Sequence, residues 1–175
     1  RGVGGEECPA PGECIGKLPY NGAAPLMWEI VGRAGGLSRA VFMSQKEGGQ
    51  RLTAAPGSGA YGALGVWVQT FMRPRMEFIV PPHVFIPRPK VDSAVLSFVP
   101  LPEAAAGRDV EPGALAATLK ACFQQRRKQL GSIARSMGKS AALLEGLGIA
   151  PTLRPENLAP EEFHRLSRAG FYPQA

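Results

Sequence analysis

The chain carries Leu18-Pro19-Tyr20-Asn21 just after a short apolar run, Cys14-Ile15-Gly16. This order predicts a short strand over residues 13–17 that ends at a turn. The proline fixes its own backbone and aims its carbonyl, and the tyrosine after it presents an exposed ring. Stacking of a nucleobase on such a ring is worth roughly 1–3 kcal/mol. The stretch is therefore typical of a strand end that grips a flat base drawn out of a nucleic acid.

Further strands and helices are predicted on the C-terminal side of this stretch. Helices are expected from Pro25 to Gly35-Gly36, over residues 47–54 and over residues 61–71. Strands are expected at residues 40–43, through Met76, Phe78 and Val80, and over residues 93–99, where Ala94, Leu96 and Phe98 share one side. This mixture predicts an α/β fold for residues 13–101, preceded by a loose tail over residues 1–12.

Only helices are predicted after Pro102. Apolar residues recur at helical spacing from Leu115 to Met137, which predicts one long helix. A second helix is expected over residues 140–147, capped by Gly148, and a third from Pro160 to Ala169. We therefore expect a domain boundary between residues 101 and 112 and a small helical domain over residues 112–175.

The composition restricts the class of protein. The 175 residues are 45% hydrophobic, and no apolar run approaches the roughly 18 residues of a membrane span. No signal-peptide pattern opens the chain, so we expect a cytoplasmic protein. The cysteines (Cys8, Cys14 and Cys122) have no metal-ligand spacing and both histidines stand alone, so we expect neither a disulfide framework nor a metal site. The first residue is arginine, which suggests a processed chain, an expression product or a fragment.

Positive charge gathers in one segment. The chain has 20 lysines and arginines against 14 acidic residues, a net charge of +6. No acid lies between Pro112 and Leu144, and the cations there are Lys120, Arg126, Arg127, Lys128, Arg135 and Lys139. This pattern predicts a basic helix that attracts phosphate backbones. The alternative is a helix face whose charges are simply solvated.

Two aromatic residues far apart in the chain are candidates for the two sides of a base clamp. Tyr20 follows a strand end, and Phe85 lies within Pro81-Pro82-His83-Val84-Phe85-Ile86-Pro87-Arg88-Pro89-Lys90. The prolines leave this loop little conformational entropy to lose on binding. The alternative is that Phe85 anchors an extended connector in the core, and residue types alone favour that alternative.

A series of short blocks has an informative order and spacing. The blocks are Lys17-Leu18-Pro19-Tyr20-Asn21 with Ala24-Pro25-Leu26-Met27, Phe42-Met43-Ser44-Gln45-Lys46-Glu47, Ala60-Tyr61-Gly62-Ala63-Leu64, Val80 to Val95, Phe123-Gln124-Gln125-Arg126-Arg127-Lys128, and Gly148-Ile149 with Arg154-Pro155-Glu156-Asn157-Leu158. In this order, from about residue 13 to 172, they resemble the ribosomal RNA adenine dimethyltransferases (the KsgA/RsmA family). The Pro89-Lys90-Val91-Asp92-Ser93-Ala94-Val95 block is the most specific.

The resemblance implies part of a Rossmann-like class I methyltransferase sheet, followed by a small all-helical RNA-binding domain. It implies methyl transfer from S-adenosylmethionine to N6 of two adjacent adenosines near the 3′ end of small-subunit rRNA. The reaction would belong to ribosome biogenesis, with a precursor of the 30S subunit as partner and a monomeric enzyme.

The resemblance also implies roles for individual residues. The target base would be flipped out, with Tyr20 on one face and Phe85 on the other. The carbonyl of Pro19 or Leu18 would accept a hydrogen bond from N6, and Lys17 and Pro19 would border the cofactor. The residues expected to contact RNA phosphates are Arg88, Lys90, Arg126, Arg127 and Lys128.

The chain departs from the family pattern in two places. The family motif opens with asparagine, whereas position 17 is lysine, which donates hydrogen bonds but cannot accept them. A glycine-rich donor loop is expected to be missing, because Gly2-Val3-Gly4-Gly5 has no strand before it. The chain would then begin near the fourth strand of the family's sheet, without the half that binds the donor.

Two alternative functions follow from these departures. One is a non-catalytic remnant that still binds rRNA or the small subunit. The other is a resistance-type methyltransferase that acts on large-subunit rRNA, and the segments Pro89 to Val95 and Gln125 to Lys128 argue against it.

Overall fold

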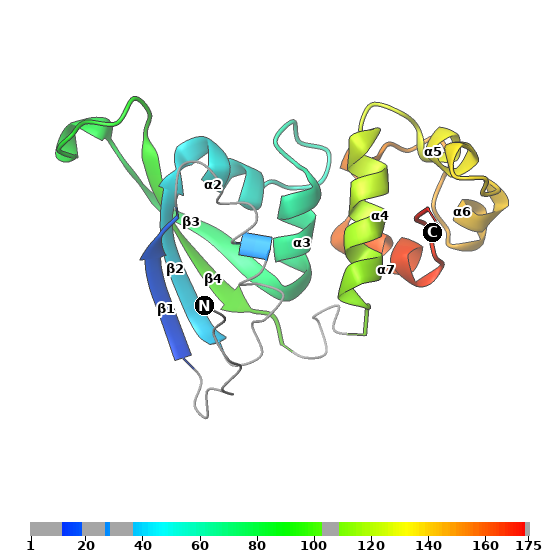
Figure 1. The fold of residues 1–175 in the computed structure, drawn as a ribbon, viewed down its shortest axis with the longest axis horizontal. Coiled ribbons are helices and arrows are strands. Elements are labelled where there is room, and N and C mark those ends of the chain that lie inside the picture. Colours follow the sequence, from blue (N-terminus) through cyan, green and yellow to red (C-terminus); the bar gives the residue numbers. More distant parts are fainter. Residues whose placement is uncertain (1–11, 19–26, 29–36, 103–108, 174–175) are drawn as a thin grey trace, which may run out of the picture.

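The computed structural model describes residues 12–18, 27–28, 37–102 and 109–173, in which a four-stranded sheet lies beside a group of helices (Figure 1). The strands are β1 (Gly12–Lys17), β2 (Leu37–Gln45), β3 (Met72–Val80) and β4 (Ser93–Pro100). The helices are α2 (Lys46–Leu52), α3 (Ala63–Phe71), α4 (Pro112–Gln124), α5 (Leu130–Ser136), α6 (Ala142–Gly146) and α7 (Pro160–Arg168), with single 3-10 turns η1 (Pro82–Val84) and η2 (Pro155–Asn157). The predicted α/β class is confirmed.

Some expectations fall on residues that the structure does not describe. The N-terminal tail, Pro19 and Tyr20 lie outside the described residues, as does most of the helix predicted from Pro25. Of that helix only Met27 and Trp28 are described, and both are helical.

The sheet order is β1-β2-β4-β3. β1 and β2 are parallel, and β4 runs antiparallel to both β2 and β3. β1, β2 and β3 therefore all point the same way, and their carboxyl ends lie at one edge of the sheet. The amino end of β4 lies at that edge too, because Ser93 pairs with both Gln45 and Val80. In mixed α/β sheets, ligands bind outside the carboxyl ends of the parallel strands.

One face of the sheet carries the core. Ala94, Leu96 and Phe98 of β4 are all completely buried, which confirms the side predicted for them. Phe42 of β2 packs against Phe98 with ring centroids 5.8 Å apart. Helices α2 and α3 lie on the same side of the sheet in Figure 1 and cover this face.

Strand β3 differs from its predicted pattern. The register shifts between Met76 and Phe78, so Met76 pairs with Leu96 whereas Phe78 pairs with Val95. Glu77 is the extra residue of this bulge, and it turns Phe78 onto the outer face, where Phe78 is 58% exposed. The strand predicted through Met76, Phe78 and Val80 is therefore present as β3, but its alternation is interrupted at the bulge.

The long helix predicted from Leu115 to Met137 is also wrong, because it is divided into α4 and α5. Glu111 caps the start of α4 by accepting hydrogen bonds from the backbone of Gly113 and Ala114. The helix ends at Gln124. The amide of Leu130 donates to the carbonyl of Leu153 at 2.8 Å, and that of Gly131 donates to Pro151 at 2.8 Å. Hydrogen bonds to a distant segment thus replace those that a continuous helix would need.

The other two C-terminal helices match the prediction closely. α6 lies inside the predicted range, and Gly148 after it has a φ of +69°, as expected of a glycine that ends a helix. α7 begins at the predicted proline, Pro160. None of the described helices has the length and apolar character of a membrane span.

The helices of the C-terminal part share a core with the sheet-bearing part. The buried hydroxyl of Tyr61 donates to the carbonyl of Leu158 at 2.8 Å. Phe123 of α4 lies between Tyr61 and Phe163 of α7, with ring centroids 6.3 and 5.6 Å away. The last strand ends at Pro100 and α4 begins at Pro112, and a division into two domains there stays a prediction.

Candidate functional site

The carboxyl edge of the sheet brings together the segments that the sequence singled out. At the end of β1, the amide of Leu18 donates to the carbonyl of Met43 at 2.8 Å, and the Leu18 side chain is only 1% exposed. Lys17, one residue earlier, is exposed. Leu18 thus fixes the point where the chain leaves the sheet, and Pro19 and Tyr20, which follow it in the sequence, lie outside the described residues.

The loop that carries Phe85 leaves the sheet at the same edge. It joins β3 to β4 and projects beyond the sheet at the upper left of Figure 1. Phe85 is partly exposed, and its neighbours Val84 and Ile86 are 55% and 101% exposed. The hydrophobic core formed by the described residues does not include Phe85, which disfavours the core-anchor alternative. A ring presented on a projecting loop suits contact with a partner.

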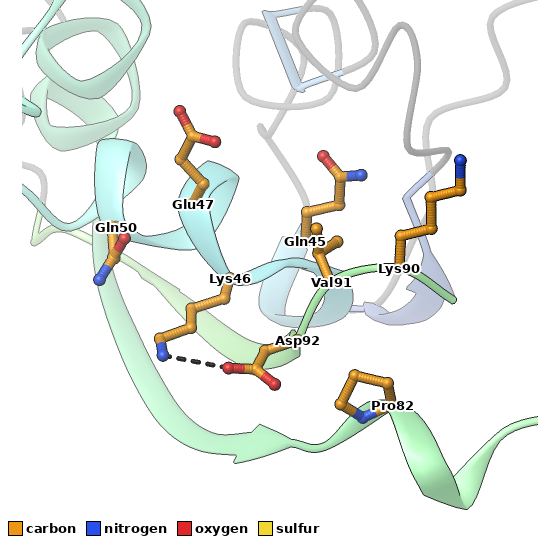
Figure 2. Close-up of a pocket in the computed structure, with 8 residues that line it drawn as sticks. All are labelled: Gln45, Lys46, Glu47, Gln50, Pro82, Lys90, Val91 and Asp92. Atoms are coloured by element: carbon orange, nitrogen blue, oxygen red, sulfur yellow. Dashed lines mark hydrogen bonds and ion pairs between the residues drawn. The ribbon is translucent and has the colours of Figure 1, made fainter. Parts of the chain in front are cut away.

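A pocket of about 520 Å³ lies between the base of this loop and the start of α2. Figure 2 shows the side chains that line it, which are Gln45, Lys46, Glu47, Gln50, Pro82, Lys90, Val91 and Asp92. Its wall is held by two contacts between the same residues. Lys46 Nζ lies 3.1 Å from Asp92 Oδ2, and the Lys46 amide donates to the Asp92 carbonyl at 3.0 Å. The returning end of the loop is thereby fixed against α2.

The basic triplet lies in the turn between α4 and α5 and not on a helix. Arg127 and Lys128 are exposed there, as are Arg88 and Lys90 on the projecting loop. The basic helix predicted for this segment is therefore corrected to an exposed basic turn that follows a helix. Exposed cations of this kind can approach phosphates.

Arg126 is only partly exposed and is held by contacts within the molecule. Its Nε lies 2.8 Å from Glu156 Oε2, and its Nη2 donates to the carbonyl of Gly59 at 2.8 Å. The Gly57 amide in turn donates to the Glu156 carbonyl at 2.6 Å. Arg126 was expected to face RNA phosphates, but in the structure it joins the loop before α3 to η2. Sequence reasoning missed these contacts, because the partners of Arg126 lie 30 and 67 residues away in the chain.

The methyl donor implied by the resemblance carries a positive sulfonium. Of the two residues expected to border it, Pro19 lies outside the described residues and Lys17 presents another cation at the end of β1. Like charges repel, and lysine has no acceptor for the hydroxyl or amino groups of the donor. Lys17 therefore does not fit the donor.

Two other side chains with chemical potential are structural. Cys122 is completely buried, and burial raises the pKa of its thiol to about 12, so it stays protonated at neutral pH. Burial likewise raises the pKa of Tyr61, whose hydroxyl remains a hydrogen-bond donor. No group of three metal-ligating side chains occurs in the part of the chain that the structure describes.

The fold, together with the candidate site at the carboxyl edge of its sheet, defines the class of protein. It is an α/β protein with a methyltransferase-like mixed sheet. The structure resembles a dimethyladenosine transferase from Plasmodium falciparum, with a TM-score of 0.79 and 23% sequence identity over 93% of this chain and 69% of that one. It also resembles the 23S rRNA methyltransferase ErmE, with a TM-score of 0.59, 22% identity, and coverage of 94% and 67%.

The sequence places the chain within a particular family. The profile of the ribosomal RNA adenine dimethylase family matches residues 10–169, and the chain belongs to that family. Over 164 residues it is 57% identical to ribosomal RNA small subunit methyltransferase A of Nitratidesulfovibrio vulgaris (strain Hildenborough), covering 91% of this chain and 60% of the relative. The protein of the same name from Lawsonia intracellularis is 46% identical over 159 residues, covering 88% and 57%. The chain thus spans about 60% of the length of these relatives.

Proposed function

We propose that this chain serves S-adenosylmethionine-dependent N6-dimethylation of two adjacent adenosines near the 3′ end of small-subunit rRNA. Its part in that reaction is to bind the RNA of the 30S precursor and to hold the target base, in the cytoplasm and as a monomer. One observation carries the proposal: within a chain of this family, the strand end before Pro19-Tyr20 and the loop with Phe85 leave the sheet at one edge.

The proposed grip on the base follows from that edge. Tyr20 and Phe85 stack on opposite faces of a flipped adenine, and stacking contributes roughly 1–3 kcal/mol per base. The carbonyl of Pro19 or of Leu18 accepts a hydrogen bond from N6 and so orients the amine. Because little covalent chemistry falls to these residues, their contribution is positioning.

The proposed grip on the RNA backbone uses exposed cations. Arg88 and Lys90 lie on the projecting loop, and Arg127 and Lys128 lie in the turn after α4. Residues 13–101 would form the base-holding part and residues 112–175 the RNA-binding part of the protein.

A second candidate function is RNA binding without catalysis. Lys17 favours it, because an ammonium cannot accept a hydrogen bond from N6 and opposes the positive charge that develops on the amine. The chain would then bind small-subunit rRNA or the subunit itself without transferring methyl groups.

RNA binding and donor binding test these proposals separately. Binding of a hairpin copied from the 3′ end of small-subunit rRNA is measured by fluorescence anisotropy at several salt concentrations. We expect the affinity to fall steeply with salt, and a Phe85→Ala variant to bind about tenfold more weakly with unchanged stability, because the ring lies outside the core. Binding that ignores salt would contradict the RNA proposal. Calorimetric titration with S-adenosylmethionine then tests the second candidate, which measurable binding of the donor by this chain would contradict.

A further inference from the structure

The pocket beside the projecting loop is not used by the base clamp. It opens at the carboxyl edge of the sheet, and Pro82 and Val91 on its wall come from the loop that carries Phe85. A ligand in this pocket would therefore lie next to a base held against Phe85. A cavity of about 520 Å³ falls in the size range of small-molecule pockets, which is roughly 300–1,000 Å³.

The charges around the pocket leave one cation available. Lys46 is paired with Asp92 at 3.1 Å, and Glu47 is paired with Arg51 at 2.5 Å. Lys90 is exposed, and no ion pair joins it to a described residue. Figure 2 shows its side chain directed away from the Lys46–Asp92 pair. The charges of the lining residues sum to zero, but Arg51 from outside the lining pairs with Glu47, so Lys90 is the lining cation that is left to meet a phosphate.

The remaining lining residues suit a nucleobase. The amides of Gln45 and Gln50 each offer donors and an acceptor, which is what hydrogen bonding to a base edge needs. Pro82 and Val91 supply apolar surface for the flat face of a ring, and Val91 is 44% exposed. Figure 2 shows Gln50 and Pro82 on opposite sides of the Lys46–Asp92 pair.

We propose that this pocket binds the nucleotide adjacent to the target adenosine in single-stranded RNA. Its base lies between the glutamine amides and the Pro82-Val91 surface, and Lys90 contacts its phosphate. The inference rests on the proposed function, because it requires RNA to reach this edge. In this proposal the pocket helps to select the position in the RNA from which the target base is flipped out.

The test combines a change in the RNA with a change in the pocket. A hairpin with two adjacent adenosines in its loop is compared with hairpins that carry an abasic site on the 5′ or the 3′ side of the target. Binding is measured by fluorescence anisotropy for the unmodified chain and for Gln50→Ala and Lys90→Gln. Gln50 is exposed on α2 and Lys90 is exposed on the loop, so neither substitution disturbs the core.

We expect one of the two abasic sites to weaken binding by the unmodified chain about fivefold to tenfold, as the loss of one stacked base would. In Gln50→Ala that penalty should shrink to less than about twofold, since the base contact is already lost. Lys90→Gln should weaken binding and reduce the salt dependence by about one phosphate contact. Arg73→Gln is the matched control, because Arg73 is exposed at the opposite end of β3 and should leave the abasic penalty unchanged.

The outcomes separate this inference from the proposed function. If the hairpins bind but each abasic penalty is the same in Gln50→Ala as in the unmodified chain, the pocket does not hold the neighbouring base and the inference is overturned. If no hairpin binds, the proposed function itself fails, and the inference fails with it. If free adenosine monophosphate binds in the pocket but Gln50→Ala does not change the abasic penalties of the hairpins, the pocket takes a mononucleotide and its assignment to RNA is overturned.

Discussion

Lys17 occupies the position at which a hydrogen-bond acceptor would help most. It is the last residue of β1 and pairs in register with Met43, so its backbone is fixed by the sheet. Its exposed ammonium offers donors only. The side chain at position 17 therefore affects whether an amine at the carboxyl edge of the sheet is held with its lone pair free or is repelled.

We expect Lys17→Asn to be required, though not sufficient, for methyl transfer to the small-subunit rRNA hairpin, because it removes a charge that opposes the one developing on the amine; the acceptor that it adds for N6 should also tighten hairpin binding by about threefold. Transfer of labelled methyl groups and anisotropy measure the two effects. Lys17→Met removes the charge without adding an acceptor, so it separates the two causes. Equal affinity and equal transfer for the unmodified chain and Lys17→Asn would show that position 17 does not touch the base.

Gly65 shows how closely α3 approaches α2. A Cβ built on Gly65 would lie 2.7 Å from the carbonyl oxygen of Arg51, which is a backbone atom that cannot move without displacing the end of α2. Gln69 of α3 also donates to the carbonyls of Leu52 and Ala54 at 3.0 and 2.9 Å. The contact between these two helices thus leaves no room for a side chain at position 65.

We expect Gly65→Ala to lower the free energy of unfolding by about 1–3 kcal/mol, measured by urea denaturation, because overpacking outweighs the gain in helix propensity. Gly48→Ala in α2 is the control. A Cβ there meets only Ser44 Oγ at 3.8 Å, an ordinary contact. That substitution should raise the unfolding free energy by about 0.5–1 kcal/mol. A stabilised Gly65→Ala would mean that the two helices are not packed so closely.

Arg126 and Arg127 are adjacent in the chain, yet the structure gives them different surroundings. Arg126 links η2 to the loop before α3 through Glu156 and Gly59, whereas Arg127 is exposed. Because the Arg126 and Glu156 side chains are 35% and 28% exposed, solvent weakens their ion pair only in part. Arg126 therefore positions the basic turn, and its exposed neighbours Arg127 and Lys128 are the residues that we propose to contact phosphates.

We expect Arg126→Ala to lower the unfolding free energy by about 1–2 kcal/mol, with most of that loss shared with Glu156→Gln in a double-mutant cycle. Arg127→Ala should leave stability within about 0.5 kcal/mol and instead weaken hairpin binding and reduce its salt slope by about one contact. Urea denaturation and salt-dependent anisotropy on the same variants measure both. Loss of stability in Arg127→Ala, or additive effects in the cycle, would contradict this division of roles.

Across the whole molecule, the sequence was sufficient to predict the features that depend on residues close together in the chain. The apolar side of β4 and the caps of α6 and α7 depend on residues close in the chain, and these were predicted correctly. The bulge at Glu77 and the break after α4 depend on partners elsewhere: β4 for the first, and the segment 151–153 for the second. A single sequence carries no signal for either.

In the candidate site too, features within one continuous block of sequence were identified, whereas contacts between distant segments were not. The resemblance singled out Phe85 and the basic triplet, since both lie in continuous blocks of sequence, and their roles toward RNA stay predictions. It did not separate Arg126 from Arg127, and it did not indicate the Lys46–Asp92 pair, whose members are 46 residues apart. Contacts that assemble the edge from distant segments are a property of the folded chain.

The junction between the sheet-bearing part and the helices contains a buried histidine. His164 of α7 is 7% exposed, and its Nε2 lies 3.0 Å from Thr70 Oγ1 of α3. Because the Thr70 hydroxyl donates to the Val66 carbonyl at 2.8 Å, it accepts from a protonated Nε2. Burial lowers the pKa of His164 below its ordinary 6.5. The neighbouring charges act in both directions: Glu161 and Asp109 raise this pKa, and Arg168 lowers it.

The lowered pKa makes the stability of the whole molecule depend on pH. Above about pH 6.5 His164 is neutral in both the folded and the unfolded chain, so its contribution is fully present. As the pH falls below that value the unfolded chain takes up the proton first, and stability is lost until the pKa of the folded state is passed.

We expect the urea midpoint to fall between about pH 7.5 and about pH 5.5. His164→Gln keeps a donor near the position of Nε2 but does not titrate, so it should flatten this dependence. His83→Gln, a change of the exposed histidine in η1, should leave the dependence as it is in the unmodified chain. If His164→Gln retained the full loss of stability, the junction between α3 and α7 would not be its source.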